Sequence, residues 1–254
     1  MKMIVILLLA GTASIFSQEF KEELLVYQND TLPFRILIPK NYNTQRSYPL
    51  LIFLHGAGER GSDNKSQLVH GSSLFKSDDF KKKYPSIVIF PQCPAKSSWA
   101  NVKRNDEMLT GKKFDFFKEI SENKQLIMVE KLLDFIKKKY NIDSSRRYVG
   151  GLSMGGMGTF ELVARNPDYF AAAFPICGAG NPSWSNHLKT TPFWIFHGEE
   201  DEVVSVDFSR KMYKALSKEK ASVRLTIYPK VNHNSWENAF SDPDLMYWLF
   251  SNKR

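Results

Sequence analysis

The feature that most restricts the fold of this chain is a serine between glycines at residues 151–155, which read Gly-Leu-Ser-Met-Gly. Residues 147–150 before it have a strand pattern, and an apolar helical pattern continues after it to about Asn166. A sharp turn between a strand and a helix strains the backbone and favours small neighbours. We therefore predict a turn that exposes Ser153, followed by a helix whose free N–H groups lie beside its hydroxyl.

The motif alone does not define a site, because a glycine-rich turn with an idle serine can carry the same pattern. The rest of the chain alternates between apolar strand patterns and helical patterns. The predicted strands are 34–39, 49–54, 86–90, 147–150, 170–176, 192–196 and 223–228. The predicted helices are 124–140, 154–166, 206–217 and 243–251, and residues 66–83 are predicted to form a helical stretch with irregularities. This alternation predicts an α/β fold in one domain, residues 18–254, with a mainly parallel sheet flanked by helices.

Residues 95–123 follow a predicted strand and show no clear periodicity. Irregular segments of this length are usually functional. We expect this segment to form a small lid-like insertion or a wall of the substrate site. The alternative is a surface loop whose own aromatic side chains pack together.

The first 17 residues have the composition of an export signal. Lys2 precedes an unbroken apolar run at 3–10, and smaller residues follow. The run is too short for a permanent bilayer span. We expect a cleaved signal peptide at 1–17, no stable membrane anchor and a periplasmic or secreted mature chain. The alternative is an uncleaved strand.

The formal net charge is +8, which raises the question of nucleic-acid binding. The basic residues are scattered or lie at the ends of predicted helices, and no basic stripe interleaves with aromatic residues. The pattern favours a solvated surface and no nucleic-acid partner.

The chain has two cysteines, Cys93 and Cys177, each in an apolar context at the end of a predicted strand. We interpret them as two separate buried thiols rather than a disulfide. Neither has a second cysteine nearby, so we expect no zinc site.

A glycine pattern after the 49–54 strand, Gly56-x-Gly58-x-x-Gly61, matches a dinucleotide-binding fingerprint. The residues that follow, 62–65, form a polar loop instead of an apolar helix start. We therefore interpret this segment as a loop that offers a backbone N–H to a developing oxyanion, from Ala57 or, as the alternative, from Gly58. We expect no organic cofactor.

A serine nucleophile requires a histidine base and a carboxylate that orients it. In folds built around a strand–serine–helix turn, the chain order is serine, acid, histidine. Of the five histidines, only His233 follows the last predicted strand, where the base belongs. The acid is expected just after the 192–196 strand, and we choose Asp201 over Glu200. The second oxyanion donor is the N–H of Met154.

The motifs together resemble a known family of exported bacterial α/β-hydrolases that are often described as predicted peptidases. The segments that carry the resemblance are 54–61, 90–94, 151–156, His197-Gly198 with Asp201, and His233 with Ser235-Trp236. The group is similar to feruloyl and acetylxylan esterases of the first carbohydrate esterase family, to dienelactone hydrolases and to prolyl oligopeptidase catalytic domains. The resemblance covers about residues 33–250.

The resemblance implies an α/β-hydrolase fold and ester hydrolysis by Ser153, His233 and Asp201, on a small acyl ester or an acylated polysaccharide of the plant wall. Ser205 departs from the family pattern, where proline is usual. Trp99 and Trp236 are candidate substrate walls, with packing as the alternative role. Two other functions stay open: a serine peptidase of the prolyl oligopeptidase type and a non-catalytic polymer-binding module.

Overall fold

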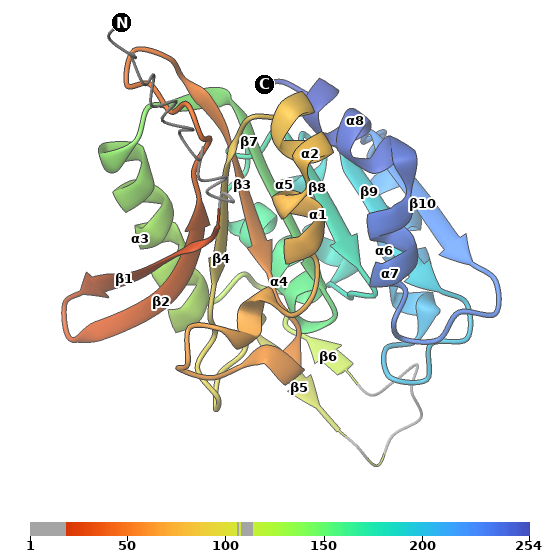
Figure 1. Cartoon of the computed structure of the whole chain (residues 1–254). Helices are drawn as coiled ribbons and strands as arrows, with labels where there is room; N and C mark the ends of the chain where they lie inside the picture. The colour runs from red at the N-terminus through yellow and green to blue at the C-terminus, as the bar shows by residue number, and fades with distance from the viewer. Residues whose placement is uncertain (1–18, 106, 108–113) are drawn as a thin grey trace, which may run out of the picture.

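An eight-stranded sheet forms the centre of the molecule (Figure 1). The computed structural model of the chain describes residues 19–105, 107 and 114–254. The strands are β1 (Lys21–Tyr27), β2 (Asp30–Leu37), β3 (Tyr48–Leu54), β4 (Ile87–Pro91), β7 (Ile142–Leu152), β8 (Ala172–Ile176), β9 (Phe193–Gly198) and β10 (Val223–Tyr228). Their order is β1-β2-β4-β3-β7-β8-β9-β10. β2 pairs antiparallel with β1 and β4, and the strands from β4 to β10 are parallel.

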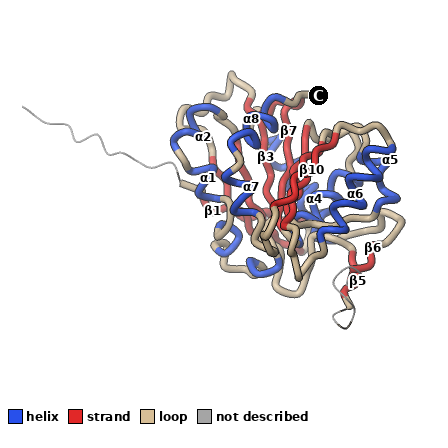
Figure 2. The backbone as a smooth tube through the Cα atoms, turned by 90° about the vertical axis from the view of Figure 1, so that its right-hand side faces the viewer, coloured by secondary structure: helices blue, strands red, loops and turns tan. Residues whose placement is uncertain are grey.

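Helices cover both faces of the sheet (Figures 1 and 2). One layer contains α3 (Lys124–Lys139), α4 (Met154–Arg165), α5 (Ser185–Leu188) and α6 (Val206–Lys218). The other contains α1 (Ser72–Lys76), α2 (Asp78–Lys83), α7 (Trp236–Ser241) and α8 (Pro243–Ser251). Alternate residues of β3 divide between the two cores, because successive side chains of a strand point to opposite faces. The predicted α/β fold with a mainly parallel sheet is confirmed.

The longest helix, α3, illustrates how the local sequence sets an element. The side chain of Asn123 caps it by accepting hydrogen bonds from the N–H groups of Gln125 and Leu126. Three lysines, 137–139, occupy its last turn, where cations favour the helix dipole. Its apolar residues at helical spacing are buried against the sheet. None of the helices in the described part of the chain is both long and apolar enough to cross a membrane.

The helical stretch with irregularities that the sequence predicts at 66–83 is divided into short elements. The segment contains a 3-10 turn at Ser66–Leu68 and the two short helices α1 and α2. Gly71 breaks the pattern with a left-handed φ of 81°, which favours glycine. Ser77 has extended backbone and caps α2 by accepting a hydrogen bond from Phe80. The sequence predicted irregularities in this stretch but not the positions of these two breaks.

The edge strand β1 was not predicted from the sequence. Its first residues, 21–23, are charged, and its side chains are mostly exposed. Edge strands often carry charged residues because one side has no partner strand, and such residues hide the strand pattern. The predicted signal peptide at 1–17 lies outside the described residues.

The irregular segment 95–123 contains a small hairpin of β5 (Val102–Arg104) and β6 (Phe114–Phe116). The hairpin lies near the ends of the central strands (Figure 1). The part of the predicted lid at 106 and 108–113 lies outside the described residues. Strands of three residues are too short to show a periodic sequence pattern, so the sequence did not predict them.

A buried carboxyl group on α4 forms a hydrogen bond with the backbone near the beginning of the 95–123 segment. Glu161 is 1% exposed, and its Oε2 accepts a hydrogen bond of 2.6 Å from the N–H of Asn101. The Asn101 side chain in turn donates to the carbonyls of Ser121 and Glu122, at the other end of the segment. Burial raises the pKa of Glu161 to about 7.

This burial predicts a pH-dependent stability. A glutamate has a pKa near 4.3 in the unfolded chain, whereas Glu161 has a pKa of about 7 in the folded protein. The free energy of unfolding therefore decreases as the pH rises from about 4.3 to about 7. Glu161→Gln keeps an acceptor for Asn101 but cannot ionise. Between pH 5 and pH 9, we expect the free energy of unfolding of the parent to decrease by ~3 kcal/mol more than that of Glu161→Gln.

Urea unfolding at both pH values measures the difference. Glu237→Gln, on the exposed side of α7, is the matched control and should keep the pH dependence of the parent. An unchanged pH dependence in Glu161→Gln would contradict the assignment.

Candidate active site

Ser153 occupies a strained turn between β7 and α4. Its φ is 52°, a region that residues with a side chain rarely adopt. A Cβ added to Gly155 would overlap the carbonyl oxygen of Leu54, and one added to Gly151 would overlap the carbonyl of Gly155. The Ser153 N–H donates to the Ile176 carbonyl at 2.9 Å. Close backbone contacts therefore fix the serine at the ends of β3 and β8, and the predicted strand, turn and helix are present.

Three residues that the sequence analysis selected lie in one hydrogen-bonded chain. His233 follows β10, and its Nε2 lies 2.9 Å from the Ser153 hydroxyl oxygen. Its Nδ1 lies 2.7 Å from Oδ2 of Asp201, in the loop after β9. Since a carboxylate only accepts, Nδ1 carries the proton and Nε2 is the acceptor for the serine. This arrangement can remove the serine proton, as nucleophilic catalysis requires.

Hydrogen bonds compensate for the burial of Asp201, which is 7% exposed. Burial alone would raise the pKa of its carboxyl group, but hydrogen bonds from His197 and His233 hold it well below its usual range. The second oxygen, Oδ1, accepts from the N–H groups of Val203 and Val204 at 2.9 and 2.8 Å. The carboxylate is therefore ionised and fixed beside His233.

His197 is a second neighbour of this carboxylate. Its ring is fully buried, and its Nε2 lies 3.2 Å from Asp201 Oδ2 and 2.8 Å from the Val204 carbonyl. Both partners are acceptors, so Nε2 carries a proton, while Nδ1 contacts the Ser209 hydroxyl at 2.7 Å. The structure adds the contact with the acid, which no local sequence signal indicates.

Both predicted oxyanion donors face the same cavity as Ser153. Ala57 begins the 3-10 helix Ala57–Glu59, and Met154 begins α4, so the N–H of each precedes the first intrahelical bonds. The buried His55 supports the first loop. Its Nε2 accepts from the Cys93 N–H at 2.9 Å, and its Nδ1 donates to the Gly56 carbonyl at 2.6 Å. Burial lowers the pKa of His55 to about 4, which keeps it neutral at neutral pH.

A cavity of about 500 Å³ opens beside Ser153. Besides Ser153, His233 and the 56–58 loop, its lining includes Glu59, Arg60, His70, Ser98, Val102, Arg104, Phe114, Met157, Val203, Val204 and Trp236. Phe114 belongs to the β5–β6 hairpin, so this hairpin forms one wall. The sequence contains no local signal for a role of Phe114, His70 or Arg60 at this cavity, because only the fold brings their distant segments together.

The two tryptophans proposed as substrate walls have different positions. Trp236 lines the cavity, with its ring centroid 5.6 Å from that of His233. Trp99 is fully buried, is not part of the lining, and packs edge-on against His55 at 5.4 Å. Gly158 makes room for it, since an added Cβ would come within 2.5 Å of the tryptophan. The assignment of Trp99 as a substrate wall is therefore wrong, and the alternative role in packing applies.

The two cysteines are free and buried. Cys177 forms, with Asp201 and His233, the one group of potential metal ligands found in the described part of the chain, with ligand atoms within 4.8 Å of one another. Burial and the neighbouring Asp201 raise the pKa of the Cys177 thiol, so it is protonated and a poor ligand. Asp201 and His233 are already bonded to each other. The group does not fit a metal site.

Comparison with known proteins shows that the chain is similar to esterases. Residues 41–244 match the phospholipase/carboxylesterase family. The chain is 27% identical over 164 residues, 64% of its length, to a bifunctional acetylxylan esterase/xylanase of Neocallimastix patriciarum. It is 26% identical over 144 residues, 57% of its length, to feruloyl esterase B of Neurospora crassa. It spans 21% and 44% of the lengths of these two relatives.

Among solved structures, that of a thermostable esterase is 35% identical to the chain and superimposes with a TM-score of 0.84. The match covers 94% of this chain and 64% of the esterase. The predicted resemblance to α/β-hydrolases of the feruloyl and acetylxylan esterase group is confirmed.

The contact between His197 and Asp201 predicts a measurable effect on Ser153. We expect phenylmethanesulfonyl fluoride to modify Ser153, and His197→Phe to lower the limiting rate of modification about tenfold. Phenylalanine keeps a ring but has no N–H, and a hydrogen bond to a charged group contributes about 1.5 kcal/mol or more. The reagent concentration at half-maximal rate should not change, because His197 does not line the cavity.

Ser209→Ala serves as the control, because it alters the other nitrogen of the ring and leaves the contact with Asp201. It should react within about twofold of the parent. A full limiting rate in a His197→Phe protein with the parent melting temperature would exclude a positioning role for His197.

Proposed function

The chain belongs to the phospholipase/carboxylesterase family, and we propose that it hydrolyses carboxylic esters through a covalent acyl-enzyme on Ser153. The observation that supports this most directly is the hydrogen-bonded chain from Ser153 through His233 to Asp201, with distances of 2.9 and 2.7 Å, at the wall of an open cavity. The arrangement matches the roles of nucleophile, base and orienting acid.

In the proposed reaction, the Ser153 hydroxyl oxygen attacks the ester carbonyl while His233 Nε2 accepts its proton. The N–H groups of Ala57 and Met154 hold the negative oxygen of the tetrahedral intermediate. His233 then gives its proton to the leaving alcohol. Water, deprotonated by His233, attacks the acyl-serine and releases the acid. Asp201 stabilises the imidazolium through its fixed carboxylate and stays ionised.

We further propose that the substrate is a feruloyl or acetyl ester on a plant cell-wall polysaccharide. Two relatives are named for activity on such esters, an acetylxylan esterase/xylanase and a feruloyl esterase. The apolar part of the cavity, with Phe114, Met157 and Trp236, suits an aromatic acyl group. The export signal expected at 1–17 would deliver the enzyme to the periplasm or outside the cell, where such polymers occur.

The serine peptidase of the prolyl oligopeptidase type remains the alternative, because it uses the same three residues in the same order. The non-catalytic binding module is the second alternative. It would require Ser153 to remain inert although its base and acid are in place.

Replacement of the serine tests the catalytic role. We expect Ser153→Ala to lower kcat for 4-nitrophenyl acetate by about 10⁴-fold or more, since removal of the nucleophile leaves only binding and oxyanion stabilisation. Steady-state assays of purified proteins measure the change. Ser98→Ala, which alters another serine at the cavity, is the control and should keep kcat within a few-fold. Undiminished hydrolysis by Ser153→Ala would support the binding module.

A substrate panel separates esterase from peptidase. We expect kcat/KM for methyl ferulate or acetylated xylo-oligosaccharides to exceed that for a prolyl anilide by at least about a hundredfold, because an anilide needs protonation of a poorer leaving group. Ser153→Ala provides the background rate for every substrate. A faster reaction with the prolyl anilide would overturn the esterase assignment in favour of the peptidase.

A further inference from the structure

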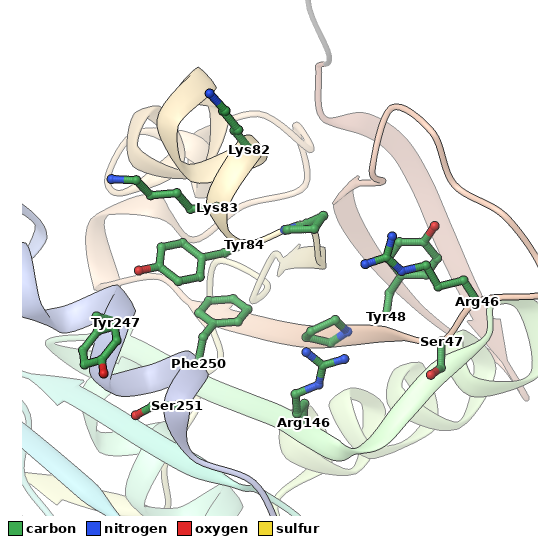
Figure 3. Close-up of a pocket in the computed structure, with 12 residues that line it drawn as sticks. Arg46, Ser47, Tyr48, Lys82, Lys83, Tyr84, Arg146, Tyr247, Phe250 and Ser251 are labelled. Carbon is green, nitrogen blue, oxygen red and sulfur yellow. The ribbon is translucent and has the colours of Figure 1, made fainter.

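Figure 3 shows a second cavity, of about 510 Å³. It includes Tyr48 at the start of β3 and therefore lies at the other end of the sheet from Ser153. It is formed by the loop before β3, the end of α2, the start of β7 and α8. Its lining consists of Arg46, Ser47, Tyr48, Pro49, Lys82, Lys83, Tyr84, Pro85, Arg146, Tyr247, Phe250 and Ser251. The proposed ester hydrolysis uses none of these residues.

The lining is strongly basic. It contains four cationic side chains and no carboxylate. Lys83 pairs with Asp79 at 3.0 Å, whereas no carboxylate within the described part of the chain pairs with Arg46 or Lys82. Arg146 is bonded through Nε to Asp143 at 2.6 Å, which leaves its terminal nitrogens for another partner. In Figure 3 Arg146 points between Phe250 and Arg46, whereas Lys82 points outward. Two guanidinium groups from different elements therefore approach one space, an arrangement suited to a carboxylate or phosphate.

Flat apolar surfaces border this charged space. Tyr84 and Phe250 are stacked, with ring centroids 4.8 Å apart. Tyr247 is 69% exposed, and the Arg46 guanidinium lies 5.5 Å from the centre of the Tyr48 ring. Tyr84 and Phe250 are half-buried and Tyr48 is buried, so Tyr247 is the exposed ring here that can pack against the C–H face of a sugar. The combination of rings and cations fits a ligand that has both a ring and a negative charge.

The site continues into a neighbouring hollow of about 760 Å³. The two cavities share Arg46, Tyr48, Lys82, Tyr84 and Pro85, and the second adds Lys40 and Lys81. Its one acidic residue, Asp78, is already paired with Lys81 at 3.0 Å. The continuous surface can hold more than one ring of a chain-like ligand.

The position of the cavity suits a long ligand. β3 starts at this cavity with Tyr48 and ends with Leu54, next to the loop of the proposed oxyanion donors. Seven residues of strand span about 20 Å. A small substrate cannot contact both sites at once, whereas a polymer can.

We propose that this basic and aromatic cavity binds a carboxylate-bearing sugar of an acidic polysaccharide, separately from the active site. The choice of a saccharide rests on the proposed function. The choice of a ligand with a negative charge and a ring follows from the cavity itself and does not depend on that function. A neutral sugar would leave the arginines without a counter-charge. An inorganic anion would leave the exposed Tyr247 ring without a partner.

Isothermal titration calorimetry at low salt tests the proposal with the Ser153→Ala protein, in which no turnover occurs. The probes are a glucuronic-acid-substituted xylo-oligosaccharide and the unsubstituted oligosaccharide of the same length. We expect the acidic probe to bind at least tenfold more tightly, and added salt to weaken it, because the contact is ionic. Arg46→Gln combined with Arg146→Gln should weaken binding of the acidic probe at least tenfold.

Arg224→Gln, at an exposed position on β10, is the matched control and should bind as the parent does. Arg46→Gln alone provides a second variant, since Arg46 is exposed and unpaired within the described residues, and should weaken binding severalfold with an unchanged melting temperature. With Ser153 present, these variants should hydrolyse 4-nitrophenyl acetate at the parent rate.

Equal binding of both oligosaccharides, or undiminished binding by the double variant, would overturn the proposal. Tighter binding of inorganic phosphate or of a single-stranded oligonucleotide would also overturn it, in favour of a phosphate site. The outcome does not depend on esterase activity, because the titration uses a protein without the proposed nucleophile. Loss of the esterase assignment and loss of this site are therefore distinguishable.

Discussion

The site depends on a close backbone contact between the start of α4 and the ends of two strands. Gly155 lies against the carbonyl of Leu54, the last residue of β3, with no room for a side chain. Gly156 also lies close to β8, since an added Cβ would come 2.7 Å from the Ile176 carbonyl. A bulkier residue would push the helix away from the sheet. Such a shift would displace Ser153 and the Met154 N–H from the Ala57 loop and from His233, so the contact determines the whole geometry.

A second constraint is the burial of one carboxylate. Asp201 loses water but receives hydrogen bonds from two histidines and two backbone N–H groups, which favour its ionised form. Each donor comes from a loop at the carboxyl ends of β9 and β10 or from β9 itself. His197 further connects this carboxylate to Ser209 on α6. The acid is therefore held by the sheet and by a helix on its face, and the orientation of His233 follows from both.

The sequence predicted the parts of the molecule that are governed by local rules. Apolar runs identified the central strands, because parallel strands buried on both faces have little other choice of residue. The helical spacing of its apolar residues identified α3. The sequence did not predict the charged edge strand β1 or the three-residue strands β5 and β6, because the local signal was weak there. In the segment 66–83 it predicted an irregular helical stretch but not the positions of the breaks at Gly71 and Ser77.

For the candidate site, the sequence by itself selected Ser153, Asp201 and His233, because chain order and strand ends restrict which residues can meet at one edge of a parallel sheet. Only the tertiary structure decided what surrounds them. It buried Trp99 under His55, placed His197 against Asp201, and made Phe114 and Trp236 walls of one cavity. It also gathered Arg46, Arg146 and Phe250 from three distant segments at the other end. Such contacts depend on packing between elements that are far apart in the chain, and no local pattern encodes them.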